Sequence, residues 1–388
     1  MARAILEREL KGEPARAVAA GRAQFAVAGQ ADDADIRQLL RENAMSGDIS
    51  LTLEREPDYF ADANLPGETK QTIIARMGGT IACMGSCSIR QRFVNGAPYR
   101  VGYLGGLRLD ARQAGRFDIV RRGYQFFRET QSPEPADFYF TSIAADNARA
   151  RQFLESALPG MPLYEFIGEF VTVLLPVGRS SHSGQCDGSL PGDPKTVFPI
   201  TGEFINCLND CNRQFQFAPC WEVETVHALQ TLGLRPEDYC TLYEENQPIA
   251  NAALWDQRGF KQIVIRDYSS KLTMARPILN FLARFGGPRL PALGEKLANG
   301  FVLHLAVESD RPALMAALMR ELNRMGASRG LEYLTLGFDA RDPRLAIVRS
   351  KSRCREYRTR LYVVRWPELG RSAQELGPQL LAPEVALL

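Results

Sequence analysis

The feature that most constrains the fold is an order of elements that recurs on both sides of one break in composition. The break is residues 180–194 (SSHSGQCDGSLPGDP), which are small, polar and turn-forming and show no hydrophobic periodicity. Strand and amphipathic-helix patterns follow in the same order in each half, and residues 139–143 match residues 333–337 at an offset of 194. The pattern predicts an internal duplication in an α/β chain, with two tandem domains that each hold a mixed central sheet flanked by helices.

Hydrophobic periodicity also predicts the individual elements. In the first half we expect strands at 25–28, 71–77, 80–94, 99–109, 137–143 and 166–177, and helices at 32–40, 117–130 and 146–157. In the second half we expect strands at 239–244, 248–254, 300–307, 331–337 and 359–366, and helices at 274–285, 311–329 and 341–350. Asp146 is the expected N-cap of its helix.

The composition break sets the expected division of the 388 residues. We expect an N-terminal helical segment at 1–22, a first domain at 23–178, a linker at 179–197, a second domain at 198–370 and a C-terminal tail at 371–388.

Charge and hydropathy exclude several classes of partner. The chain has 47 Lys and Arg against 45 Asp and Glu, so no excess of positive charge points to nucleic acid or to a membrane surface. No apolar run approaches the ~18–20 residues of a membrane span, and residues 1–22 lack the apolar core of a signal peptide. The eight cysteines show no disulfide-framework spacing, so we expect a cytoplasmic protein with reduced thiols.

Familiar catalytic and metal motifs are absent from the sequence. It contains no H-E-x-x-H, no P-loop and no G-x-S-x-G. Cys207 and Cys211, followed by Cys220 and His227, resemble metal ligands in type, but three small apolar side chains in a helix–turn region explain them better. His182 and Cys186 fall in the turn-rich break. We therefore expect no metal.

The most informative segment is residues 103–118, YLGGLRLDARQAGRFD. A strand ends near Leu109, a turn carries Arg112 and Gly115, and a helix begins near Arg116. Free N–H groups at a helix N-terminus favour an anion such as a diphosphate, and a glycine lets the backbone approach it. The alternative is an ordinary strand–turn–helix corner with a solvated arginine face.

This segment resembles the diphosphate loop of the GCN5-related N-acetyltransferase family, R/Q-x-x-G-x-G/A. Arg112 and Gly115 match its first two fixed positions, whereas Phe117 stands where Gly or Ala is usual. The family's later Asn-x-x-Ala helix is matched at Asn147 and Ala150.

The resemblance departs from the family at the following aromatic pair. Phe153 fits, but Leu154 replaces the tyrosine that protonates the departing coenzyme A thiolate in many members. In the second half, the strand at 300–307 runs into residues 308–312 (ESDRP), which have no glycine loop and add carboxylates. The second copy is therefore expected to be degenerate.

The resemblance implies an N-acetyltransferase that uses acetyl-CoA as co-substrate and moves acetyl to a small-molecule or peptide amine by direct attack. The residues expected to bind the cofactor are Leu107, Arg108, Leu109, Arg112, Gln113, Ala114, Gly115, Arg116, Phe117 and Asn147. Tyr103, Tyr164 and Glu56 are the candidates for proton transfer, against packing tyrosines and a surface loop.

Two other functions remain open on these residues. One is a non-catalytic coenzyme A or acyl-CoA binding protein, and the other is an enzyme like the N-acyl amino acid synthases, which uses a longer acyl donor. The acceptor is not identified, and a homodimer is left open.

Overall fold

The computed structural model describes residues 22–45, 47–131, 134–178, 194–195, 201–245, 247–282, 289–307, 311–351 and 354–388. The expected N-terminal helix, most of the linker and the turn at 308–310 lie outside these residues.

The first half confirms most of the expected elements. Its strands are β1 (Gln24–Val27), β2 (Ile49–Glu54), β3 (Glu68–Met77), β4 (Thr80–Val94), β5 (Ala97–Leu109), β6 (Phe138–Ala144) and β7 (Leu163–Pro176). Its helices are α2 (Asp33–Glu42), α3 (Phe117–Thr130) and α4 (Ala148–Leu154). Strand β2 was not predicted. Asn147 caps α4, and the expectation that Asp146 does so is wrong, because the Asn147 side chain accepts the bond from the Ala150 N–H.

The second half repeats the order with additions. Its strands are β8 (Pro194–Lys195), β9 (Tyr239–Glu244), β10 (Gln247–Trp255), β11 (Gln262–Tyr268), β12 (Asn299–Ala306), β13 (Tyr333–Asp339) and β14 (Arg355–Arg365). Its helices are α5 (Gly202–Asn212), α6 (Val223–Ala228), α7 (Ser270–Leu282), α8 (Pro312–Ser328) and α9 (Pro343–Lys351).

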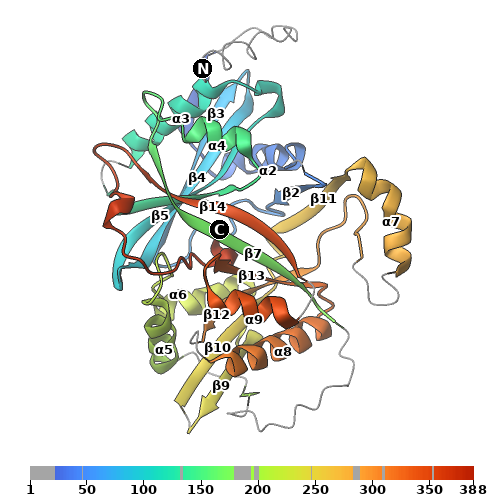
Figure 1. Cartoon of the computed structure of the whole chain (residues 1–388). Helices are drawn as coiled ribbons and strands as arrows, with labels where there is room; N and C mark the ends of the chain where they lie inside the picture. The colour runs from blue at the N-terminus through green and yellow to red at the C-terminus, as the bar shows by residue number, and fades with distance from the viewer. Residues whose placement is uncertain are drawn as a thin grey trace.

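One 12-stranded sheet runs through both halves, in the order β1-β3-β4-β5-β6-β14-β7-β13-β12-β10-β9-β8. At its centre the halves exchange strands. β14, from the second half, pairs antiparallel with β6, and β7, from the first half, pairs antiparallel with β13. Figure 1 shows β14 and β7 lying side by side between the blue-green and the yellow-orange parts of the chain. Each half therefore completes the sheet of the other.

The two halves can be aligned residue by residue at their parallel strand pairs. The parallel pairing of β5 with β6 begins at Val101 and Phe138, and that of β12 with β13 begins at Asn299 and Tyr333. The matching strands β6 and β13 are both seven residues long. The first residues of these strands, Phe138 and Tyr333, are 333 − 138 = 195 positions apart. The sequence match at an offset of 194 is therefore wrong by one residue, and it aligns side chains that point to opposite faces of the sheet.

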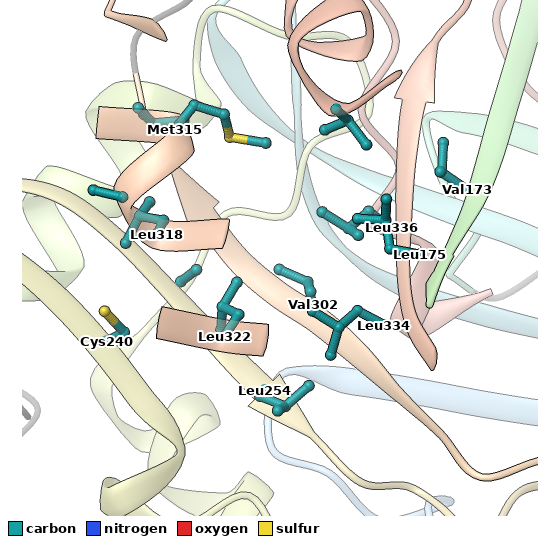
Figure 2. Close-up of a cluster of buried hydrophobic side chains, with 14 of the residues drawn as sticks. Val173, Leu175, Cys240, Leu254, Val302, Met315, Leu318, Leu322, Leu334 and Leu336 are labelled. Atoms are coloured by element: carbon teal, nitrogen blue, oxygen red, sulfur yellow. The ribbon is translucent and has the colours of Figure 1, made fainter. Parts of the chain in front are cut away.

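The exchange also builds the core of the second half. Met315, Leu318 and Leu322 from α8 pack on Val302, Leu334 and Leu336, and these contact Val173 and Leu175 of the first-half strand β7, as Figure 2 shows. All of these side chains are buried. Because this apolar burial spans the composition break, the free energy of unfolding of each half depends on the other.

A second, two-stranded sheet also joins the halves, where β2 pairs antiparallel with β11. Within the described residues, no helix is both long and apolar enough to cross a lipid bilayer.

Candidate functional site

The first half contains a point where two parallel strands part. β5 and β6 pair only at Val101–Phe138, Gly102–Tyr139 and Tyr103–Phe140, although both strands continue beyond these positions. Just after this point β5 has a bulge against β4, with Gly106 at φ +64°. A bulge removes backbone groups from the ladder and aims them elsewhere. The geometry thus leaves β5 backbone groups outside the β-ladder at this point.

The expected phosphate turn follows directly on β5. A short 3₁₀ turn at Ala111–Gln113 leads to Gly115, which is exposed at φ +89°, and α3 then begins at Phe117. A Cβ built on Gly115 would meet no atom within 4 Å. Only glycine adopts this conformation without strain, and the helix dipole of α3 favours an anion at this turn.

The arginines of the turn are paired with aspartates. Arg112 donates to Asp110 through its backbone N–H at 2.7 Å and its Nη2 at 2.6 Å, and Arg116 makes an ion pair with Asp118 at 2.8 Å. Hydrogen bonds from Arg112 hold the pKa of Asp110 below its ordinary value. The turn is therefore closer to electrical neutrality than the sequence suggests.

Phe117 occupies the position where the loop pattern has a small residue, and its ring packs against α4. It stacks on Phe153 of α4, with ring centroids 4.3 Å apart, and the Arg149 guanidinium lies 5.7 Å from its centroid. The phenylalanine is thus accommodated by packing between α3 and α4, which the motif comparison did not anticipate.

Leu154 lies in the core. It is buried with Ile143, Met161 and Tyr362 between α4 and the sheet. A tyrosine at this position would have to displace these side chains, so the position does not present a side chain to a ligand.

The two candidate tyrosines lie on opposite faces of the sheet. Tyr103 is opposite Phe140 in register, whereas Tyr164 is opposite Val364, which is in turn opposite Tyr139. Side chains of neighbouring residues in a strand point to opposite faces. Tyr164 packs on the face covered by α3, which we call the α3 face, and Tyr103 points to the other face, which α2 covers and which we call the α2 face.

Each tyrosine has a hydrogen-bond partner. The Tyr103 hydroxyl lies 2.9 Å from Ser142 Oγ, so it bridges β5 and β6 just beyond the point where they part. The Tyr164 hydroxyl lies 2.5 Å from that of Tyr124 on α3. Burial raises the pKa of both Tyr103 and Tyr164 above the ordinary value. Both phenols are therefore neutral donors at neutral pH.

The carboxylate of the third candidate, Glu56, is paired with two arginines. Its carboxylate oxygens accept bonds from Arg37 at 2.5 Å and from Arg41, both on α2. Its backbone N–H donates to Gln262 Oε1 on β11. These contacts make Glu56 a link between α2 and the second half.

Sequence reasoning missed a charged cluster on the α2 face. Asp62 accepts bonds from Lys70 and, at 2.5 Å, from Arg55. Lys70 is opposite Ser88 in register, and Ser88 is opposite Tyr103, so the cluster lies in the same row as Tyr103. Burial, with repulsion from Arg55, lowers the pKa of Lys70 to about 8. No motif links these residues, because the loop at 55–67 brings them together only after folding.

A fourth charge lies near this cluster. Burial, with repulsion from Arg55, lowers the pKa of Lys261 to about 7, and its Nζ donates to a backbone oxygen of Leu388 at 2.6 Å. The residue comes from the second half, immediately before β11.

The second half has an equivalent parting of strands, but a segment of the chain lies there. β12 and β13 pair only at Asn299–Tyr333, Gly300–Leu334 and Phe301–Thr335. The short helix at Val385–Leu387 contacts both strands. At the bulge of β12, the His304 N–H donates to Glu384 Oε2 at 3.3 Å.

The comparisons with known proteins agree with this architecture. The structure is similar to a GCN5-related N-acetyltransferase from Sphaerobacter thermophilus, with a TM-score of 0.54 and 12% identity over 92% of this chain and 98% of that one. It is also similar to Saccharomyces cerevisiae N-myristoyltransferase with bound myristoyl-CoA, with a TM-score of 0.55 and 10% identity over 96% of this chain and 89% of that one. This chain has the fold of the GCN5-related N-acetyltransferases. No protein-family model and no curated protein sequence matches it.

The likeness covers nearly the whole chain, so the acetyltransferase fold includes both halves and the exchanged strands. The expected mixed sheet flanked by helices is confirmed. Within the described residues, no group of three or more His, Cys, Asp or Glu side chains is arranged to hold a metal ion.

Proposed function

We propose that the protein is an acyl-CoA-dependent N-acyltransferase that binds its donor in the first half and moves acetyl from acetyl-CoA to an amine. The observation that carries the proposal is the continuous path from the parting of β5 and β6, past the bulge at Gly106, to the Gly115 turn at the start of α3. A thioester fits the bulge end of this path and a diphosphate fits the helix end.

The reaction needs three things of the site. Backbone N–H groups of β5 orient the thioester carbonyl and stabilise its oxygen as negative charge develops there. The neutral amine attacks the carbonyl carbon from the α2 face, the C–S bond breaks, and coenzyme A leaves as a thiolate. A proton passes from the amine nitrogen to a base or to water, and the thiolate takes one up.

The proton carriers differ in how well the structure suits them. Tyr103 faces the side from which the acceptor approaches, next to the strand parting. Tyr164 faces α3 instead, and Glu56 is held by Arg37 and Arg41. Tyr103 is therefore the candidate we retain for donating a hydrogen bond near the thioester.

The burial of Leu154 favours one competing function, a coenzyme A binding protein without catalysis. Release of free thiol from acetyl-, octanoyl- and myristoyl-CoA, measured with and without a panel of primary amines, separates the alternatives. Amine-dependent release that is fastest with acetyl-CoA supports the proposal. Faster release with a longer donor would favour the long-chain enzyme, and saturable binding without release by any amine would favour the binding protein.

A further inference from the structure

Arg108 is a cation on the acceptor side without an acidic partner. It lies on β5 just past the bulge, opposite Met84, so it points to the α2 face. Its guanidinium donates to the Leu107 carbonyl at 2.9 Å and lies 3.4 Å from Met45 Sδ. Among the described residues, no carboxylate lies within ion-pair distance of it, whereas most neighbouring arginines have one.

Arg108 is half-buried, so its guanidinium is partly withdrawn from water but can still be reached by a ligand. Burial lowers its pKa below the ordinary value, and two tyrosines, Tyr103 and Tyr357, are its other electrostatic neighbours. A ligand carboxylate would supply both the opposite charge and the acceptors that this half-buried guanidinium lacks. A methionine sulfur and a backbone carbonyl leave most of the five N–H donors of the guanidinium without a strong acceptor.

Tyr357 comes to this place through the strand exchange. It lies on β14, two residues before Thr359, and alternation along β14 from Leu361 places it on the α2 face. It is 44% exposed, and burial raises its pKa, which Asp146 raises further and Arg108 partly offsets. The second half thus contributes a neutral hydroxyl donor on the same face as Arg108, two strands away in the sheet.

The other charged side chains on the α2 face also carry more positive than negative charge. Arg55 and Lys70 share a single carboxylate, Asp62, and Lys261 lies close enough for Arg55 to lower its pKa. Four cations, Arg55, Lys70, Arg90 and Arg108, thus stand against two carboxylates, Asp62 and Glu68, on the α2 face. Positive charge is in excess there, although the chain as a whole is nearly neutral.

We propose that the acceptor is an amine that carries a carboxylate, and that the Arg108 guanidinium binds that carboxylate with the Tyr357 hydroxyl as a second donor. The proposal rests on the proposed function, because it names the acceptor class of the same site. A planar carboxylate fits the guanidinium fork through two parallel N–H···O bonds. Binding of this group would place the amine beside the thioester.

The test measures binding, so it does not depend on turnover. The protein, with and without coenzyme A, is titrated calorimetrically with N-acetyl amino acids and with the matching N-acetyl amino acid amides. We expect the acids to bind about ten- to a hundredfold more tightly than the amides, the range expected for a hydrogen bond to a charged group. Arg108→Gln should remove this preference and Arg108→Lys should restore part of it.

Two further variants serve as controls. Arg258→Gln alters a partly exposed arginine that is paired with its own Asp256, and it should keep the preference for acids. Tyr357→Phe should weaken binding of the acids more than that of the amides, which keeps the proposal testable if Arg108→Gln does not fold. Thermal shifts with coenzyme A should be equal in Arg258→Gln, Tyr357→Phe and the parent.

Two results would overturn the proposal. These are equal affinity of the parent for acids and amides, and an unchanged preference for acids in Arg108→Gln. Failure of the proposed function would give other results. Coenzyme A would not bind, or no amine would release free coenzyme A from an acyl-CoA, whatever the preference for acids.

Discussion

Gly106 and His304 occupy the same position in the two halves. Each comes five residues after the first parallel pair of its strand, at Val101 and Asn299, and each has a positive φ, +64° and +56°. Glycine adopts this conformation without strain, whereas a histidine does so only when its surroundings hold it. Trp221 packs on the His304 ring with a centroid separation of 4.4 Å. The first half therefore keeps an accessible bulge, and the second half has converted it into core.

One molecule of coenzyme A should bind per chain. The bulge N–H at His304 is already bonded to Glu384, and the helix at Val385–Leu387 lies against both parting strands. Within the part of the second half that the structure describes, the equivalent place is therefore filled by the chain itself. At a ligand concentration of about 100 times the dissociation constant, linkage predicts ~2.7 kcal/mol of stabilisation, which a thermal shift detects. A calorimetric titration that fits two equivalent sites per chain would contradict this.

Gly115→Asp should abolish binding of coenzyme A and leave the fold intact. The substitution places a negative side chain beside the diphosphate and forces a non-glycine residue to φ +89°, at a cost of about 1–3 kcal/mol. Gly79→Asp is the matched control, because Gly79 has φ +85° and equally open surroundings in the β3–β4 hairpin. Calorimetry should show binding by the control and none by Gly115→Asp. Retained affinity in Gly115→Asp would place the diphosphate elsewhere.

Most strands and helices could be predicted from local patterns, because hydrophobic periodicity and turn-forming residues depend only on neighbours in the sequence. They could not show that β14 lies between β6 and β7, since pairing partners across the composition break leave no local trace. The turn at Gly115 was predicted for the same local reason.

The rest of the candidate site depends on contacts between distant residues. The spacing of Tyr103 and Tyr164 does not reveal that they face opposite sides, because that follows from register with β6 and β14. Likewise, Arg108 belonged to the expected cofactor residues, and only its position opposite Met84 shows that it points to the α2 face.

Tyr103→Phe and Tyr164→Phe should have different effects. Tyr103 faces the acceptor side, so loss of its hydroxyl should lower kcat by at least about 10², the lower end of what general acid–base help provides. Tyr164 bonds to Tyr124 beneath α3, so its loss should leave kcat within a few-fold and reduce the free energy of unfolding by about 1 kcal/mol. Steady-state kinetics and urea unfolding of both variants check this. Full turnover in Tyr103→Phe would remove it as a proton carrier.

Leu154→Tyr should destabilise the protein without raising its turnover. The side chain lies against Ile143, Met161 and Tyr362, and inserting a larger ring into such packing typically costs 1–3 kcal/mol. Leu158→Tyr, at a position that is 44% exposed, is the control and should leave the midpoint of thermal unfolding unchanged. A rate increase in Leu154→Tyr would show that α4 can present a side chain to the thioester.

Glu384→Gln should stabilise the protein at pH 8 and leave it unchanged near pH 4. Burial raises the pKa of Glu384 to about 7, an effect that Arg92, Arg90 and Arg344 only partly offset. The folded state therefore favours the protonated carboxyl, so stability from this group is full below the ordinary pKa of 4.5 and falls as pH rises to about 7. The loss at pH 8 is up to about 3 kcal/mol.

His304 contributes an opposite pH dependence to stability, and the difference in free energy of unfolding between parent and variant separates the Glu384 effect from it. Burial lowers the pKa of His304 to about 3, so its neutral form stabilises the fold above its ordinary pKa of 6.5, and that stability falls as pH drops. The variant keeps His304 and an acceptor for its N–H, so subtracting the two urea-unfolding curves at each pH cancels the histidine contribution. The gain of Glu384→Gln over the parent should grow between pH 4.5 and 7 and stay constant above. A gain that does not change with pH would mean that Glu384 has the same pKa in the folded and unfolded states, with the three arginines fully offsetting its burial.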